Sequence, residues 1–124
     1  PDAYNLNCFT SHAGLFGTID GLSHTLLRVE KELSLIPLLK EALVASSQRF
    51  NYGFDRAQGN NSLAGQGASE QCFGHLGFTG TSFWIDCEKE LGHIILTNST
   101  KRYWFKKEKL NNFRREVGAL VWRR

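Results

Sequence analysis

The stretch Phe73–Asp86, which reads FGHLGFTGTSFWID, carries the strongest structural signal in the chain. It sets Gly74, Gly77 and Gly80 among apolar and aromatic residues. Glycines inside a strand mark a close approach of another backbone or of a ligand, and a Thr-Gly pair between apolar runs marks a tight turn. The stretch therefore predicts two antiparallel strands joined by a turn, with His75 on the first strand.

The flanking residues extend this pair of strands into a sheet. Three strands are expected at 72–78, 81–87 and 92–98, and the short links between them make neighbouring strands antiparallel. Aromatic and polar residues alternate at 50–55, which predicts one further short strand. Residues 56–71 are rich in Gly, Asn, Ser and Gln and are expected to form a long loop.

Two helices are expected before the sheet. Thr18 is a good N-cap for the first, at 19–33, and Asp20 complements the positive end of its dipole. Apolar residues recur along this helix at steps of three and four, which predicts one buried stripe: Ile19, Leu22, Leu26, Val29 and Leu33. The second helix is expected at 37–47, with Pro37 in its first turn. Its buried side is expected to hold Leu39 and Leu43, with Leu38 as a further candidate.

The last helix is expected at 106–122, and residues 1–17 are expected to form an ordered loop. The apolar face of that helix is predicted to consist of Leu110, Phe113, Val117, Leu120 and Val121. Strands that follow one another with short links, between helices, are typical of the α+β class. The chain is therefore predicted to be a single domain over 1–124, with a three- to four-stranded antiparallel sheet flanked by helices.

Composition narrows the classes of protein that fit. The chain has 124 residues, 41% hydrophobic and 22% charged, with a net charge of +3, which is typical of one globular domain. No apolar run reaches 18 residues, so no membrane span is expected, and the compartment stays unknown. The basic residues near the C-terminus would be the basis of nucleic-acid binding: Lys101, Arg102, Lys106, Lys107, Lys109, Arg114 and Arg115. Glu108 and Glu116 interrupt them, which favours a solvated helix face and no nucleic-acid partner.

The cysteines and histidines do not form a recognisable metal motif. Cys8, Cys72 and Cys87 are odd in number and widely spaced, without a C-x-x-C pair. Three reduced thiols are expected, with a Cys72–Cys87 bridge between neighbouring strands as the alternative. The spacing of Cys8, Cys72, His12 and His75 does not support a metal site, and no cofactor is predicted.

Two blocks of sequence resemble a known family. FGHLGFTGTSFWIDCEKELGHIILTN is similar to the end of the serine β-lactamase-like hydrolases, which include class C β-lactamases, penicillin-binding proteins and related esterases. SHAGLFGTIDGLSHTL, from Ser11 to Leu26, is similar to the family's HAGLFSTADDLA segment, and PDAYNLN resembles the segment just before it. The resemblance implies the C-terminal part of the β-lactamase/transpeptidase-like fold.

The resemblance assigns roles to residues of the first strand and its turn. His75-Leu76-Gly77 corresponds to the family's third catalytic element, often K-T-G or H-T-G, in which a cation or donor binds substrate or tunes a proton. Gly77 would let the substrate lie against the strand, Thr79 would contact it, and the backbone N–H of Phe78 would be one oxyanion donor. Leu76 replaces the usual threonine, which favours an esterase or peptidase-like parent over a β-lactamase.

Two further candidate substrate contacts come from the same resemblance, His12 in the HAGLF segment and Asn98 after the last strand. The family's R-V-H-P continuation after Asn98 is absent, so its roles do not transfer. By contrast, His24 and His93 are expected to be structural.

The family's nucleophile is missing from this chain. No serine is followed three residues later by lysine, so the S-x-x-K motif is absent, and no Y-x-N motif stands at the right place. The chain begins with Pro1 and contains no methionine, which we interpret as a fragment of a larger domain. The resemblance then implies the C-terminal segment of a serine hydrolase, inactive alone, whose partners are the N-terminal remainder and a small acyl or peptide-like substrate. Its exposed sheet is expected to self-associate. The alternative is a non-catalytic binding or scaffold module derived from that fold.

Overall fold

The computed structural model describes residues 2–8, 14–45, 47–99 and 107–124. These residues form four helices and five strands. The helices are α1 (Asp2–Leu6), α2 (Ile19–Leu33), α3 (Leu35–Ala45) and α4 (Lys107–Val121). The strands are β1 (Phe50–Asn51), β2 (Phe54–Arg56), β3 (Cys72–Leu76), β4 (Ser82–Asp86) and β5 (Leu91–Ile95). The α+β class predicted from the sequence is confirmed.

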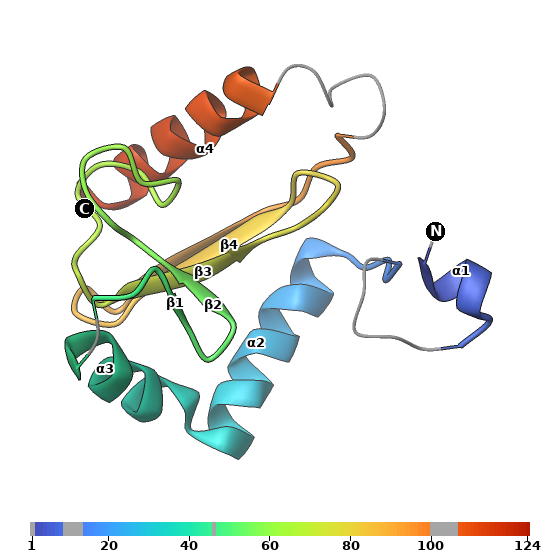
Figure 1. Cartoon of the computed structure of the whole chain (residues 1–124), viewed down its shortest axis with the longest axis horizontal. Helices are drawn as coiled ribbons and strands as arrows, with labels where there is room; N and C mark the ends of the chain where they lie inside the picture. The colour runs from blue at the N-terminus through green and yellow to red at the C-terminus, as the bar shows by residue number, and fades with distance from the viewer. Residues whose placement is uncertain (1, 9–13, 46, 100–106) are drawn as a thin grey trace.

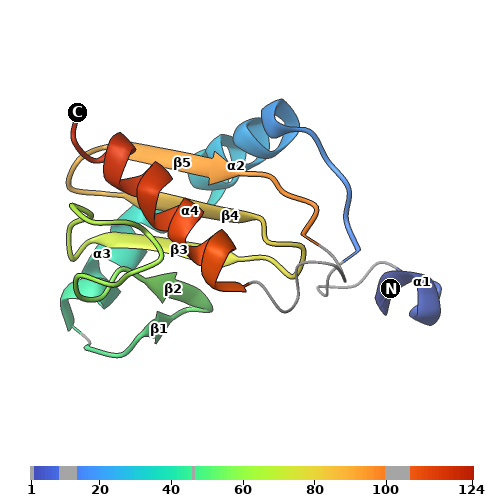
Figure 2. The same ribbon diagram turned by 90° about the horizontal axis from the view of Figure 1, so that it is seen from above.

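The five strands make one open antiparallel sheet in the order β1-β2-β3-β4-β5, so every strand pairs with its neighbour in sequence. The β3–β4 pair sets Gly74 opposite Trp84 and His75 opposite Phe83. Figure 1 shows α4 on one face of this sheet and α2 and α3 on the other. Figure 2 shows α4 crossing above the central strands.

The sheet has one strand more than predicted, because the segment expected as a single strand at 50–55 is a hairpin. Phe50 pairs with Asp55 and Asn51 with Phe54, which leaves Tyr52 and Gly53 as a two-residue turn. Both turn residues have positive φ, 48° and 84°. A two-residue hairpin turn of this kind matches the twist of its strands, but Tyr-Gly lacks the Asn or Asp that usually signals it.

Tight packing closes the face of the sheet under the C-terminal half of α4. Trp84 and Cys72 project from the strands and pack with Ala64 of the long loop and Trp122, which follows α4. The indole N–H of Trp122 donates to the Ala64 carbonyl at 2.7 Å. Gly118 of α4 lies so close to this carbonyl that a β-carbon there has no room. The glycine therefore sets the distance between α4 and the loop.

The face under α2 and α3 is only half closed. Leu39 and Leu43 of α3 are buried, as predicted, and pack with Phe73 and Cys87. Of the fifteen described residues of α2, none is buried, although Thr18 caps its N-terminus as predicted by accepting the Gly21 N–H at 3.1 Å. The apolar stripe of α2 therefore forms in the helix but does not close onto the sheet.

Several expected boundaries and faces were wrong. Asp2–Leu6 is helical rather than part of a loop. The helix expected at 37–47 spans Leu35–Ala45, because Ser34 adopts φ 50° and ends α2 while Glu30 accepts the Ile36 N–H at 2.8 Å. Leu38 is 45% exposed.

The predicted apolar face of α4 was only partly right: Leu110, Val117 and Val121 are half-buried, but two of its residues are not. Phe113 and Leu120 are 48% and 66% exposed, and the buried positions of the helix are Arg114 and Gly118. The physical reason is that the long loop, through Ala64 and Gly65, packs against the Gly118 side of the helix and fixes its rotation.

Candidate functional site

Five of the residues singled out by the sequence, His75 to Thr79, are consecutive at the end of β3 and in the β3–β4 turn. The turn is closed by the Gly77 N–H, which donates to the Thr81 carbonyl at 2.8 Å, and by the Gly80 N–H, which donates to Gly77 at 3.0 Å. Gly80 has φ 90°, and a β-carbon there would lie 2.5 Å from Thr97 Oγ1. The turn therefore requires glycine at position 80 for both conformation and space.

This turn is fastened to the rest of the fold from two sides. The Thr79 carbonyl accepts the Ser99 N–H at 2.6 Å and the Thr97 hydroxyl at 2.7 Å. From α4, the Arg114 guanidinium donates through Nη2 to the carbonyls of Gly80 at 2.7 Å and Thr81 at 3.1 Å. Burial lowers the pKa of Arg114 from its ordinary value. Two backbone oxygens hold this charge in the fold: the Gly80 carbonyl and the Thr81 carbonyl, the second of which also accepts the Gly77 N–H.

The structure places the predicted site residues on different surfaces. His75 is exposed on the face that carries α2 and α3, opposite Phe83 in register. Leu76 points to the other face and packs against the cluster of Trp84 and Trp122. Strand side chains alternate between faces, so His75 and Leu76 do not form one surface.

The remaining candidates lie nearer the turn. Thr81 Oγ1 occupies the position that a β-carbon on residue 77 would need, so the turn requires glycine there for its packing. Phe78 is 62% exposed and Asn98 is exposed. The bonds from residues 97 and 99 to Thr79 bring Asn98 beside the turn. His12 lies outside the described residues.

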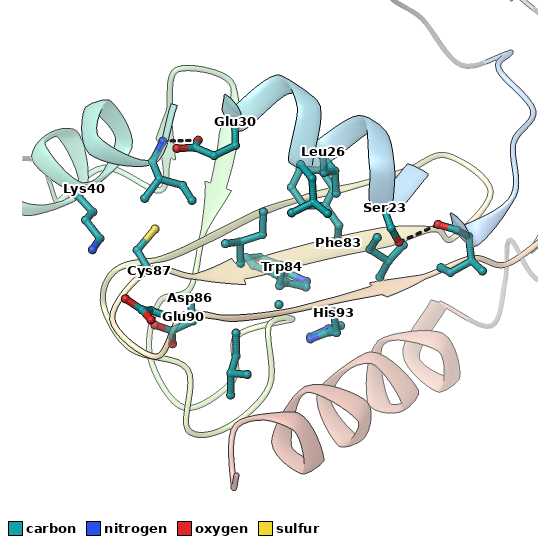
Figure 3. Close-up of a pocket in the computed structure, with 17 residues that line it drawn as sticks. Ser23, Leu26, Glu30, Lys40, Phe83, Trp84, Asp86, Cys87, Glu90 and His93 are labelled. Carbon is teal, nitrogen blue, oxygen red and sulfur yellow. Dashed lines mark hydrogen bonds between the residues drawn. The ribbon is translucent and has the colours of Figure 1, made fainter. Parts of the chain in front are cut away.

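A cavity of about 660 Å³ separates α2 from the sheet. Figure 3 shows Leu26 and Ser23 facing it from α2, with Phe83 on the sheet opposite and Lys40 and Cys87 toward one end. This volume falls in the range of about 300–1,000 Å³ that holds small ligands. Its lining is mainly apolar and includes Ile19, Leu26, Leu27, Ile36, Phe83, Trp84, Ile85, Leu91 and Ile94.

Neither the Cys87 thiol, which lines this cavity, nor the buried Cys72 thiol is suited to act as a nucleophile. Burial raises the pKa of the Cys87 thiol, and the charge of Lys40 opposes this only in part. Burial also raises the pKa of Cys72, with smaller contributions from Asp86 and Cys87. Both thiols therefore stay protonated at neutral pH and are weak nucleophiles.

The alternative of a Cys72–Cys87 disulfide is wrong. All three cysteines are free, with Cys8 exposed and the other two buried. Cys72 packs in the cluster under α4 and Cys87 in the cluster under α3, so the two thiols point to opposite faces of the sheet. Within the described residues, no group of three His, Cys, Asp or Glu side chains is arranged to hold a metal ion. No described helix is both long and apolar enough to cross a membrane.

Sequence reasoning missed Arg114 as the residue that organises the turn. It treated this arginine as part of a solvated basic face, whereas its side chain is 5% exposed and contacts the turn 33 and 34 residues earlier. No local pattern marks such a contact, because the partners are backbone carbonyls far away in sequence.

Comparisons with known proteins do not assign this chain to a family. No family model, no curated protein and no solved structure matches this chain.

Proposed function

We propose that this chain is the C-terminal segment of a serine hydrolase of the β-lactamase and penicillin-binding-protein type, acting on an amide or ester. A serine supplied by the N-terminal remainder attacks the carbonyl carbon, the leaving group departs, and water hydrolyses the acyl-serine. His75 binds or polarises the substrate, and the Phe78 N–H is one donor to the oxyanion. Gly77, Thr79, His12 and Asn98 lie along the substrate in this proposal.

The observation that carries the proposal is the resemblance of FGHLGFTGTSFWID to the end of that family, with His75-Leu76-Gly77 in the place of its third catalytic element. Further support comes from the hairpin that this stretch forms and from the exposed position of His75 on β3. The turn is held rigidly by Arg114 and Thr97, as a strand that orients a substrate needs to be.

The proposed partner, the N-terminal remainder of the enzyme, has a place to pack. The cavity under α2 is bounded by apolar residues of α2 and the sheet, and Leu27 of α2 is 70% exposed. An amphipathic helix that carries the serine and lysine would bury this surface and approach the face on which His75 lies. Without that helix, the same apolar surface favours self-association of the isolated segment.

The test begins with the N-terminal sequence of the protein as its cells produce it. If an S-x-x-K motif lies upstream, the full-length protein is expected to react with a fluorophosphonate probe at that serine and to hydrolyse p-nitrophenyl acetate or a chromogenic cephalosporin. Changing His75→Ala should lower kcat/KM by about a hundredfold, whereas the exposed His24→Ala control on α2 should not change it. A full-length protein with the motif but no labelled serine contradicts the proposal.

A second function, a non-catalytic binding module, is favoured by one observation. The chain carries its own cavity of about 660 Å³ and lacks S-x-x-K. A native protein without the motif that binds an apolar dye in this cavity would support that function over hydrolysis.

A further inference from the structure

A second, polar cleft lies on the opposite face of the sheet, beneath the first turns of α4. It has a volume of about 350 Å³ and is formed by the β2 region, the loop at 58–63, the centre of β4 and α4. Its lining includes Trp84, which packs under α4 and also borders the cavity under α2. Neither His75 nor any residue of the β3–β4 turn is among the residues that line it.

The cleft has a positive charge that its own residues do not cancel. Three arginines, Arg49, Arg56 and Arg115, and one carboxylate, Asp55, line it, so the lining carries a net charge of 3 − 1 = +2. Asp55 is 4% exposed and fully engaged. It accepts two hydrogen bonds from Arg49, each at 2.9 Å, and the Arg56 N–H at 3.0 Å.

Arg115 is held with its guanidinium beside the cleft by neutral partners. Its Nε donates to the Asn61 carbonyl at 3.2 Å and its Nη1 to Asn112 Oδ1 at 2.9 Å. Within the described part of the chain it makes no ion pair. A guanidinium has five N–H donors in a planar fork, so an arginine fixed in this way retains donors for an anionic group.

Two uncharged donors complete the lining. The oxygen of the Asn111 side chain accepts from Arg114 at 2.9 Å, which leaves its NH₂ group as the donor. Trp84 is 1% exposed, and its indole N–H has no hydrogen-bond partner among the described residues. An unpaired buried N–H destabilises the fold, and an acceptor bound in the cleft would remove that cost.

We propose that this cleft binds the oxyanion group, phosphate or carboxylate, of a small organic molecule. The guanidinium of Arg115 and the N–H donors of the lining residues Asn111 and Trp84 suit such a group, and no described carboxylate in the cleft is left to compete for them. The volume exceeds that of an inorganic ion and suits a ligand with an organic body. The site is independent of the proposed hydrolase, because it lies on the other face of the sheet and shares no residue with it.

The test follows the indole N–H resonance of Trp84 in the ¹⁵N-labelled 124-residue chain. Inorganic phosphate, glycerol phosphate and succinate are titrated separately at constant ionic strength. We expect the Trp84 resonance to shift with saturation while the indole of Trp122, which already donates to Ala64, moves little. Tighter binding of glycerol phosphate identifies a phosphate site, tighter binding of succinate a carboxylate site, and equal binding an oxyanion site without preference; each supports the proposal.

Matched variants separate this site from general attraction of anions. Arg115→Gln should weaken binding by about tenfold or more, because a charge-assisted pair is lost. Arg123→Gln removes the same charge at an exposed position outside the cleft and should leave binding unchanged. Should Arg115→Gln fail to fold, Arg115→Lys keeps the charge without the fork and should also bind more weakly. A Trp84 resonance that does not move, or an equal loss in Arg115→Gln and Arg123→Gln, overturns the proposal.

Discussion

The two faces of the sheet differ in how closely their helices pack against them. Under α4, Trp84, Trp122 and Ala64 are nearly inaccessible, and Arg114 and Trp122 donate hydrogen bonds across the interface. Under α2, a cavity of about 660 Å³ remains, and no residue of that helix is buried. The contrast teaches that an apolar stripe alone does not close a helix onto a sheet. Closure at α4 comes from a glycine that permits close approach and from hydrogen bonds that fix the geometry.

The largest effect is expected from adding one methyl group to α4, which tests whether its close packing depends on glycine. In a helix, Gly→Ala is favourable by about 1 kcal/mol when nothing obstructs the side chain. At Gly118 the β-carbon meets the Ala64 carbonyl, so we expect Gly118→Ala to lower the free energy of unfolding by about 3 kcal/mol or more. Chemical denaturation measures this change.

Gly21→Ala on α2 is the matched control. Its β-carbon would lie 3.2 Å from Thr18 Oγ1 and would otherwise meet open space. We expect a change of less than about 1 kcal/mol, in either direction. A stabilising Gly118→Ala would show that α4 is not closely packed on the loop.

Truncating one leucine on each helix of the other face locates where that face is closed. Leu39 of α3 is 1% exposed, so Leu39→Ala should destabilise the fold by about 3 kcal/mol through lost burial and a new cavity. Leu26 of α2 already borders a cavity, and Leu26→Ala should cost less than about 1 kcal/mol because few contacts are lost. Similar costs for the two variants would mean that α2 packs on the sheet in solution as tightly as α3.

Removing the cation that holds the β3–β4 turn tests the other means of closure. Arg114→Met keeps much of the side-chain volume but removes the guanidinium donor from the Gly80 carbonyl and one of the two donors from the Thr81 carbonyl. We expect a loss of about 2 kcal/mol in the free energy of unfolding, measured by denaturation. Arg123→Met, at an exposed position, should change it by less than about 0.5 kcal/mol. Equal effects of the two would remove the structural role assigned to Arg114.

The smallest expected effect is a pH dependence of the free energy of unfolding, which arises from a histidine on the face under α4. His93 lies under α4, with its ring 5.2 Å from that of Trp122, and burial lowers its pKa below 6.5. The unfolded chain therefore binds a proton at this site before the folded chain does, so the stability present above pH 6.5 is lost as pH falls. The slope contributed by one such group is at most about 1.4 kcal/mol per pH unit.

Thermal or chemical unfolding between pH 7 and pH 5 measures this slope. His93→Phe should reduce it, because the aromatic ring stays and the titrating group is removed. His24→Gln, on the exposed side of α2, should leave it unchanged. A slope that is the same in His93→Phe and in the unchanged chain would show that the pH dependence arises at other groups.

Local patterns in the sequence predicted a substantial part of this fold. The three strands around Phe73–Asp86, the Thr18 cap of α2 and the burial of Leu39 and Leu43 were all predicted. Each depends on neighbours within a few residues: a two-residue alternation, a capping side chain, a helical period. The β1–β2 hairpin was missed because Tyr52 adopts a positive φ, which tyrosine seldom does, and because β2 pairs with β3, a strand distant in sequence.

For the candidate site, the sequence selected residues but not the surfaces on which they lie. His75, Leu76 and Gly77 are consecutive, and the pleat of β3 sends His75 to one face and Leu76 to the other. The polar cleft was not predicted at all, because Asp55, Trp84 and Arg115 come from three distant segments. These three residues form no sequence motif, because neither their residue types nor their spacing follows a known pattern.

By itself the sequence determined the α+β class, the order of β3, β4 and β5, and the helices α2, α3 and α4, because short-range backbone preferences and hydrophobic periods fix these within each segment. Only the tertiary structure decided which side of α4 is buried, that Arg114 holds a turn more than thirty residues away, and that α2 leaves a cavity. Those outcomes depend on steric fit between distant segments, above all between Gly118 and Ala64. Such fit is a property of the assembled molecule, since a single methyl group that is harmless in an isolated helix prevents the close approach on which the packed face depends.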